Sequence, residues 1–167
     1  MGDHRGGSLE ALLKLREYGC PLDAAEVAEG AVKGEQLPVL VWAVEALGAS
    51  VQDRKLAKAA EYRYDLEVLT WLRQRGCPLN GRRVALSAAR RGHQLAALAW
   101  AAEGLGASLQ SAELMDAAAA SGRVEVMAWL RERGCPWGKG MFAGAARAGC
   151  KAALEWLEER GCPLPVS

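Results

Sequence analysis

The stretch Asp65-Leu-Glu-Val-Leu-Thr-Trp-Leu-Arg-Gln-Arg-Gly-Cys-Pro78 carries the signals of a short α-helix with a defined start and stop. Leucines at 66, 69 and 72 recur at helical spacing, and Trp71 widens the apolar stripe. Asp65 is suited to cap the first turn. A glycine after a basic last turn, with proline two residues on, is typical of a helix end. The stretch therefore predicts a helix over 65–75.

The same stop signal recurs along the chain. Gly-Cys-Pro occurs at 19–21, 76–78, 134–136 and 161–163, and Gly-Ala pairs occur at 48–49 and 106–107. These glycines are 27 to 30 residues apart, and five tryptophans follow the same period, at 42, 71, 100, 129 and 156. Self-similarity at this period indicates a repeat architecture. Repeats ending in Gly-Cys-Pro run five residues from tryptophan to glycine and those ending in Gly-Ala run six, which suggests a duplicated block of about 58 residues.

Each repeat is predicted to form two short helices, a first helix rich in alanine and a second helix that carries the tryptophan. The first helices are expected near 23–33, 52–62, 81–91, 111–121 and 139–148, and the second helices near 8–18, 36–47, 65–75, 94–105, 123–133 and 151–160. Gly92 is expected to end the helix at 81–91, where Ala88 and Ala89 would allow close helix approach. Helix pairs of this length cannot bury their apolar faces alone, so they must stack on neighbours.

The composition agrees with an all-α fold. Thr70 is the only threonine, Asn80 is the only asparagine, and the chain has no isoleucine, so strand formers are scarce while helix formers dominate. We therefore predict one repeat domain over residues 1–167, with about five and a half helix pairs in 8–163 and a flexible N-terminus at 1–7.

Two repeats resemble the ankyrin family. The segment Ala88-Ala-Arg-Arg-Gly-His-Gln-Leu-Ala-Ala-Leu98, closing at Gly106-Ala107, is similar to the ankyrin pattern, and a second copy runs from Ala118 to Met127 and closes at Gly134-Cys135. The resemblance covers about 8–163 and implies an ankyrin-like solenoid of helix pairs that binds macromolecules. The family's Thr-Pro-Leu-His start is missing, because positions 83–86 hold Arg-Val-Ala-Leu.

The connections between helix pairs are short for this family. Only 16 residues separate Gly76 from Gly92, so the β-hairpin fingers of the family are predicted to be shortened to tight turns. Because family members often bind through those fingers, the contact surface is expected to move onto the concave, exposed face of the first helices.

The ends of the array are predicted from two neighbouring positions in the second helices. The tryptophan position holds a charge only in the first repeat (Lys14), and the position before it holds a charge only in the last (Glu155). We expect the tryptophan position to face the preceding helix pair. The residue directly before it is expected to face the following helix pair. Lys14 and Glu155 would then be polar caps of a complete array.

Several residues that suggest chemistry have a simpler structural interpretation. Four cysteines replace alanine after the repeat glycine and are expected to be buried and free, too far apart for disulfides. His93 is expected to be solvated. The histidines and cysteines do not have the spacing of a zinc site, and no cysteine has a histidine base placed to activate it.

The segment Gly138-Lys-Gly-Met-Phe-Ala-Gly144 is expected to be a turn into a helix, not a phosphate loop. The tryptophan ladder is expected to pack in the core, not to stack on bases, leaving Trp137 as the more exposed aromatic side chain. No cofactor, metal or enzymatic activity is therefore predicted.

The basic side chains of the first helices are the remaining candidates for binding. The positions expected to face outward, with the charges beside them, are Lys33, Lys58, Tyr62, Arg82, Arg83, Arg90, Arg91 and Arg147. We predict a non-enzymatic protein-interaction scaffold that binds a protein partner through these residues. The alternative is a structural subunit of a ribonucleoprotein or other large assembly, in which the arginines of the third first helix contact RNA. A third possibility is a solvated face balanced by glutamates of the second helices.

The bulk properties add expectations about the environment. A formal net charge of +1 gives no general attraction to nucleic acid or anionic membrane. No apolar run approaches the roughly 20 residues of a membrane span, and the N-terminus lacks a secretory signal. Five cysteines, an odd number, favour free thiols in an intracellular reducing compartment. The chain is expected to be monomeric on its own and to take no small-molecule substrate.

Overall fold

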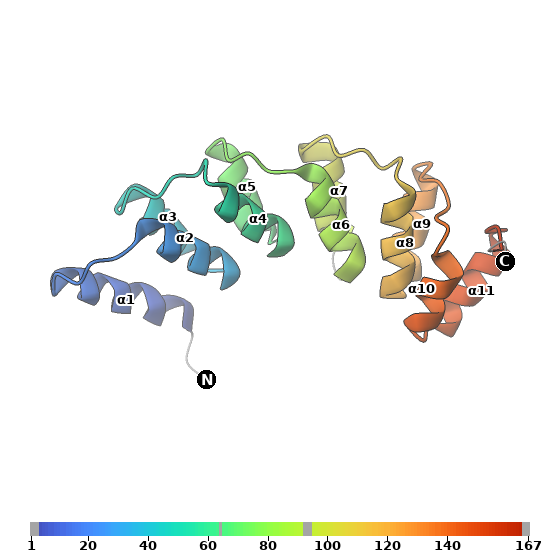
Figure 1. Cartoon of the computed structure of the whole chain (residues 1–167), viewed down its shortest axis with the longest axis horizontal. Helices are drawn as coiled ribbons and strands as arrows, with labels where there is room; N and C mark the ends of the chain where they lie inside the picture. Colours follow the sequence, from blue (N-terminus) through green and yellow to red (C-terminus); the bar gives the residue numbers. More distant parts are fainter. Residues whose placement is uncertain (1–3, 64, 92–94, 165–167) are drawn as a thin grey trace. The chain divides into compact units, whose positions relative to one another are not determined.

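The predicted all-α class is confirmed. The computed structural model describes residues 4–63, 65–91 and 95–164, and in these ranges it contains eleven α-helices and no β-strand (Figure 1). The first helices are α2 (Ala24–Lys33), α4 (Arg54–Arg63), α6 (Gly81–Arg91), α8 (Ala112–Ser121) and α10 (Met141–Arg147). The second helices are α1 (His4–Glu17), α3 (Leu37–Glu45), α5 (Leu66–Gln74), α7 (Leu95–Gly104), α9 (Val124–Glu132) and α11 (Lys151–Glu159).

The helices lie close to the predicted ranges, and α1 begins at His4, four residues before the predicted start. The flexibility expected of residues 1–7 stays a prediction. Gly92, predicted to end α6, and His93 lie outside the described residues.

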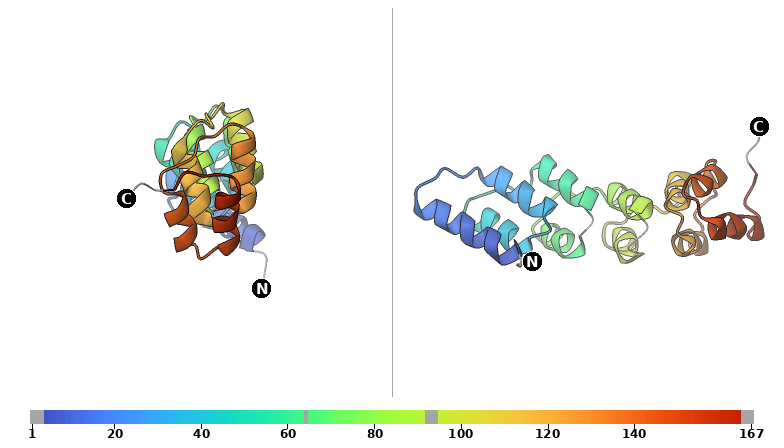
Figure 2. Two further views of the ribbon diagram at one scale, coloured as in Figure 1. Left: turned by 90° about the vertical axis from the view of Figure 1, so that its right-hand side faces the viewer. Right: turned by 90° about the horizontal axis from the view of Figure 1, so that it is seen from below.

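The helices gather into two compact units, residues 1–79 and 80–167. In the first unit α2 packs against α3 and α4, α1 packs against α3, and α4 packs against α5. In the second unit α8 packs between α6 and α10, each first helix contacts the second helix that follows it, and α9 contacts α11. Each unit therefore has a layer of first helices and a layer of second helices (Figure 2). The prediction of one continuous domain over 1–167 stays a prediction.

A repeated hydrogen bond closes the second helices. The repeat glycines adopt the left-handed conformation, with φ of 75° at Gly19 and 80° at Gly48. The N–H of the residue after glycine then returns to a carbonyl of the last turn, as from Cys77 to Leu72 at 2.9 Å and from Ala49 to Ala43 at 3.0 Å. This is the helix-ending pattern that glycine favours. The bond spans five residues in Gly-Cys-Pro repeats and six in Gly-Ala repeats, so the turn absorbs the extra residue.

Aspartates begin several helices as the sequence predicts. The Asp65 carboxylate accepts hydrogen bonds from the backbone N–H groups of Glu67 and Val68, at 2.9 and 3.4 Å. Asp23 caps α2 in the same way through Ala25 and Glu26, at 2.9 and 3.2 Å. These bonds satisfy N–H groups that have no partner within the helix.

Two glutamines 58 residues apart, each in the turn before a first helix, donate a hydrogen bond to the end of the second helix of the same pair. The Gln52 side-chain amide donates to the Gly76 carbonyl at 2.9 Å, and that of Gln110 donates to the carbonyl of Arg133, the residue before the equivalent glycine, at 3.3 Å. The matching pair supports the interpretation of a duplicated two-pair block.

Small residues form the core between first helices. Ala88 and Ala89 are 2% and 0% exposed, as predicted, and a Cβ added at Gly144 of α10 would lie 3.1 Å from the Ala120 backbone of α8. The second helices supply the larger groups, among them Leu69 and Leu72, both 0% exposed. Full burial of one leucine stabilises a fold by about 1.5–3 kcal/mol.

Replacing glycine by alanine should change the free energy of unfolding in opposite directions at a left-handed repeat glycine and at a glycine inside a helix. In Gly48→Ala the new Cβ meets nothing within 4 Å, so the strain of φ 80° alone should lower the free energy of unfolding by about 1–2 kcal/mol. The matched control Gly30→Ala, in the interior of α2 and also in open space, should raise it by about 1 kcal/mol. Urea unfolding followed by circular dichroism measures both, and equal effects would contradict the role of Gly48.

Candidate functional site

The predicted binding residues of the first unit lie on two adjacent first helices. Lys58 and Tyr62 follow one another by one turn on α4, where Tyr62 is 62% exposed. Lys33 is exposed on the neighbouring helix α2, and its Nζ lies 2.8 Å from a carboxylate oxygen of Glu29. The structure therefore brings these three side chains to one layer, with the charge of Lys33 partly balanced.

The arginines of the second unit form two groups at opposite ends of α6. Arg82 and Arg83 belong to the first turn and Arg90 and Arg91 to the last, which places the groups about 12 Å apart along the helix. Arg82 pairs with Glu113 on α8. Arg90 is exposed and has no ion pair within the described part of the chain, whereas Arg91 is half-buried.

Arg147 does not join the α6 arginines. It is exposed on α10, and α8 packs between α6 and α10. Of the positions predicted to face outward after each alanine pair, Lys33, Tyr62 and Ala148 are exposed, while Arg91 and Ser121 are half-buried.

Charge is divided between the two layers of helices. The first helices carry ten basic and five acidic residues, and one of the acids, Glu61, is buried at 2% exposure. The second helices α3, α5, α7, α9 and α11 carry three basic and eight acidic residues. The first-helix layer of each unit is therefore the more basic one, most clearly at α4 and α6.

The tryptophan ladder differs from the expected core packing. Trp42, Trp71, Trp100 and Trp129 are half-buried, and Trp156 is 9% exposed. Arginine guanidinium groups cover four of these rings, with Cζ-to-centroid distances of 5.9 Å for Arg16–Trp42, 5.0 Å for Arg75–Trp71, 3.8 Å for Arg133–Trp129 and 5.8 Å for Arg160–Trp156. Apolar neighbours leave part of these indole rings open to solvent. The guanidinium group of the arginine covers part of that open surface and is attracted to the ring face.

Trp137, expected to be the more exposed tryptophan, is half-buried like Trp42, Trp71, Trp100 and Trp129. Its ring meets that of Trp156 edge-on at 5.8 Å, and the Arg131 guanidinium lies 4.2 Å from its centroid. Trp156 and Ala128 line one open cavity of about 330 Å³ between α9 and α11. The facing predicted for the tryptophan position and for the position before it stays a prediction along the rest of the array.

The two predicted polar caps are exposed. Glu155 pairs with Lys151 on its own helix at 3.7 Å, and Lys14 lies on the surface of α1. Leu13, the position predicted to face the following pair in the first repeat, is 41% exposed, so the role of the two residues as caps stays a prediction.

The repeat cysteines fill an alanine position. Cys77, Cys135 and Cys162 are 7%, 0% and 6% exposed, and the Cys135 thiol donates to the Ser111 carbonyl at 3.2 Å. Burial raises the pKa of Cys77 to about 11, helped by the negative charges of Glu61 and Asp53. Burial also raises the pKa of Cys135 and of Cys162. Cys20 is the exception, because it is exposed although its sequence context is the same.

The glycine-rich segment 138–144 is a turn leading into α10, as predicted. The Asp116 carboxylate accepts from the Gly140 N–H at 2.9 Å, and a Cβ at Gly138 would lie 2.0 Å from a carboxylate oxygen of Asp116. A side chain at Gly138 would therefore displace the Asp116 carboxylate, whereas a Cβ at Gly140 would lie 3.6 Å from it, an ordinary contact distance.

The described residues contain no group of three or more His, Cys, Asp or Glu side chains placed to hold a metal ion. None of their helices has the length and apolar character needed to cross a lipid bilayer.

Comparisons of the chain with known protein families, with curated protein sequences and with solved structures find no match. The case for function therefore depends on the chain's own residues.

The arginines that cover the tryptophans are not among the residues predicted from the sequence. Arg75, Arg133 and Arg160 each stand four residues after a tryptophan and directly before the repeat glycine. That spacing places the two side chains on one helix face, and it was available in the sequence.

The cysteine environments predict an order of reactivity. With a pKa of about 11, the Cys77 thiol is about one-thousandth ionised at pH 8, and only the thiolate reacts with iodoacetamide. Alkylation of Cys77 should be at least tenfold slower than that of exposed Cys20 and should accelerate as the pH rises toward 11. Mass spectrometry of timed samples measures the rates. The control is the chain in urea, where the rates should converge, and similar rates in the folded chain would contradict the buried position of Cys77.

Proposed function

We propose that this chain is a non-enzymatic protein-interaction scaffold, an ankyrin-like solenoid of helix pairs that binds an acidic partner protein through its first-helix layer. The observation that carries the proposal is the charge division, with exposed basic side chains on α4 and α6 and acidic residues concentrated on the second helices. A basic layer attracts acidic surfaces and speeds their encounter.

The short connections support binding on the helices. The described connections contain no strand and consist of turns such as the one at Gly76, so the side chains available for a partner are those of the first helices. Tyr62 and Arg90 suit this role, because tyrosine and arginine are enriched at energetically important interface positions.

The expected environment of the scaffold is an intracellular reducing compartment. Cys77 and Cys135 are free thiols held protonated by burial, and they occupy positions that alanine fills elsewhere. The proposal includes no cofactor and no small-molecule substrate.

Crosslinking with mass spectrometry tests the surface. An amine-reactive crosslinker added to the chain in native extract should join Lys33 and Lys58 to acidic partner proteins. Lys151 is the matched control, since its side chain is 89% exposed but lies on a second helix. Partner crosslinks at Lys151 as frequent as those at Lys58 would count against a first-helix contact surface.

The second candidate is a ribonucleoprotein subunit, favoured by one observation: all four charged residues of α6 are arginines. Arginine guanidinium groups pair with phosphates, and such binding weakens steeply as salt rises. Replacing Arg82, Arg83, Arg90 and Arg91 by glutamate should then reduce the affinity for single-stranded RNA more than tenfold in filter binding at low salt. The control Arg73→Glu, exposed on α5, should retain wild-type affinity. RNA retention unchanged by the fourfold reversal rejects this candidate and leaves the protein scaffold standing.

A further inference from the structure

The open cavity between α9 and α11 combines an aromatic wall with positive charge. The indole rings of Trp137 and Trp156 line it, and so do the guanidinium groups of Arg131 and Arg160. Its volume of about 330 Å³ is at the lower end of the range of about 300–1,000 Å³ that ligand pockets have. Indole rings supply a large apolar contact area, and guanidinium groups bind carboxylates through paired hydrogen bonds.

The equivalent place in the first unit is closed by an ion pair. Arg75 stands four residues after the tryptophan of α5, and its guanidinium lies 2.7 Å from the carboxylate of Glu45 on α3. The equivalent residues of the second unit are Arg160 and Glu132, which both line the cavity but form no ion pair with each other. The Glu132 carboxylate instead lies 4.0 Å from the guanidinium of its neighbour Arg133. The ion pair that joins α3 to α5 is therefore replaced by an open cavity between α9 and α11.

One wall of the cavity is particular to this repeat. Trp137 follows the proline of Gly-Cys-Pro, a position that holds leucine in the other three such repeats, at 22, 79 and 164. Its ring meets that of Trp156 edge-on at 5.8 Å. A buried indole N–H usually has a hydrogen-bond acceptor, but within the described residues neither of these two has one. Both N–H groups are therefore available to an acceptor on a ligand.

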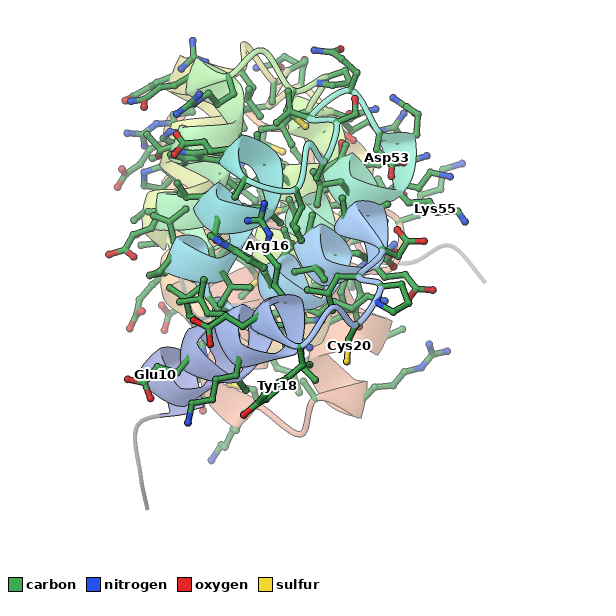
Figure 3. The ribbon with its side chains drawn as sticks, turned by 90° about the vertical axis from the view of Figure 1, so that its left-hand side faces the viewer. Glu10, Arg16, Tyr18, Cys20, Asp53 and Lys55 are labelled. Atoms are coloured by element: carbon green, nitrogen blue, oxygen red, sulfur yellow. The ribbon has the colours of Figure 1, made fainter. Side chains whose placement is uncertain are left out.

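The first repeat shows the position of Arg131 without the second indole ring. Arg16 holds that position in α1, and its side chain extends toward α3, where its Cζ lies 5.9 Å from the ring centroid of Trp42 (Figure 3). Leu22 stands in that repeat where Trp137 stands in the second unit. The wall of two indole rings therefore accompanies Arg131 and not Arg16.

The two arginines of the cavity have no carboxylate partner within the part of the chain that the structure describes. Arg131 is half-buried and is held by a hydrogen bond to the Cys135 carbonyl at 2.7 Å and by the face of Trp137. A guanidinium group has five N–H donors, so most of those of Arg131 remain available. The exposed Arg160 lies 5.8 Å from the Trp156 centroid. Both positive charges are thus held beside aromatic rings with no anion to balance them.

The charges of the lining select the class of ligand. Two arginines and one glutamate line the cavity, so one negative charge on a ligand would balance them. A carboxylate fits this balance better than a phosphate of about two negative charges, because Glu132 repels the additional charge. A cationic ligand does not fit, because guanidinium groups already lie over both rings.

We propose that this cavity binds the carboxyl terminus of a partner protein whose last residue is aromatic or large and apolar. The terminal carboxylate accepts hydrogen bonds from Arg131 and Arg160, and the last side chain packs against Trp137 and Trp156. A carboxyl terminus suits an open cavity, because its carboxylate and last side chain share one Cα and the rest of the chain leaves through the opening. The site lies on second helices and is distinct from the first-helix layer, so either proposal can fail without the other.

Nuclear magnetic resonance of the ¹⁵N-labelled full chain tests the site directly. The probe is the peptide acetyl-Gly-Gly-Gly-Phe with a free carboxylate. The indole N–H signals of Trp137 and Trp156, assigned through Trp137→Phe and Trp156→Phe, should shift together during the titration, while that of Trp100 stays in place. The same peptide ending in an amide should bind about tenfold more weakly, because it lacks the charge that the arginines bind. The amide peptide acetyl-Gly-Asp-Gly-Phe, whose charge is on a side chain, should bind as weakly as the uncharged amide.

Matched variants test the residues of the cavity. Arg160→Gln should weaken binding of the free-acid peptide by about tenfold, whereas Arg75→Gln, at the equivalent position of α5, should leave it unchanged. Trp137→Leu, which introduces the residue of the other Gly-Cys-Pro repeats, should also weaken binding while the helix content in circular dichroism stays that of the wild type. Equal affinities for the acid and amide peptides would overturn the proposal, and so would an unchanged affinity in Arg160→Gln. Equal binding of the aspartate peptide would overturn the preference for a chain terminus, and tighter binding of phenyl phosphate would overturn the choice of a carboxylate.

Discussion

The hydrogen bond that closes each second helix is the constraint on which the rest of the structure depends. It forms only because the repeat glycine takes a left-handed φ, between 66° and 82° at the six repeat positions. The bond stops the second helix at a fixed point and turns the chain back toward the next first helix. The residue after glycine is always alanine or cysteine, and it is buried in four of the six repeats, the exceptions being exposed Cys20 and half-buried Ala107.

From this geometry follows the division between apolar and charged surfaces. First helices that approach within the contact distance seen between Gly144 and Ala120 leave room only for small residues between them. Most of their charged side chains therefore lie on the outer face, with Glu61 of α4 as a buried exception, and α4 and α6 are strongly basic. The second helices instead carry the large leucines and the tryptophans, whose exposed edges are covered by arginines such as Arg133.

The helices could be predicted because their signals are local. The spacing of apolar residues, the aspartate caps and the repeat glycines were enough to locate the helices. What the sequence did not reveal depends on neighbours in space. Trp137 was expected to be exposed because it stands outside the ladder, but a ring from the next pair and a guanidinium from the previous helix enclose it. The exposure of Leu15 was missed for the same reason, since its sequence context is that of the buried Leu72.

For the candidate binding residues, their location on the first helices was predictable from the sequence. The pairing of Arg82 with Glu113 and the separation of Arg147 from α6 were not, because both depend on which helices pack side by side.

The nearest-neighbour packing within each unit has a consequence for how the chain folds. In the second unit α8 contacts α6, α9 and α10, so most of its partners lie within one repeat length along the chain. Closing such short loops costs little entropy, and topologies of this kind fold quickly. Stability is then close to a sum over pairs and their interfaces. A helix with few partners, such as α1, should exchange its amide hydrogens long before α8 does.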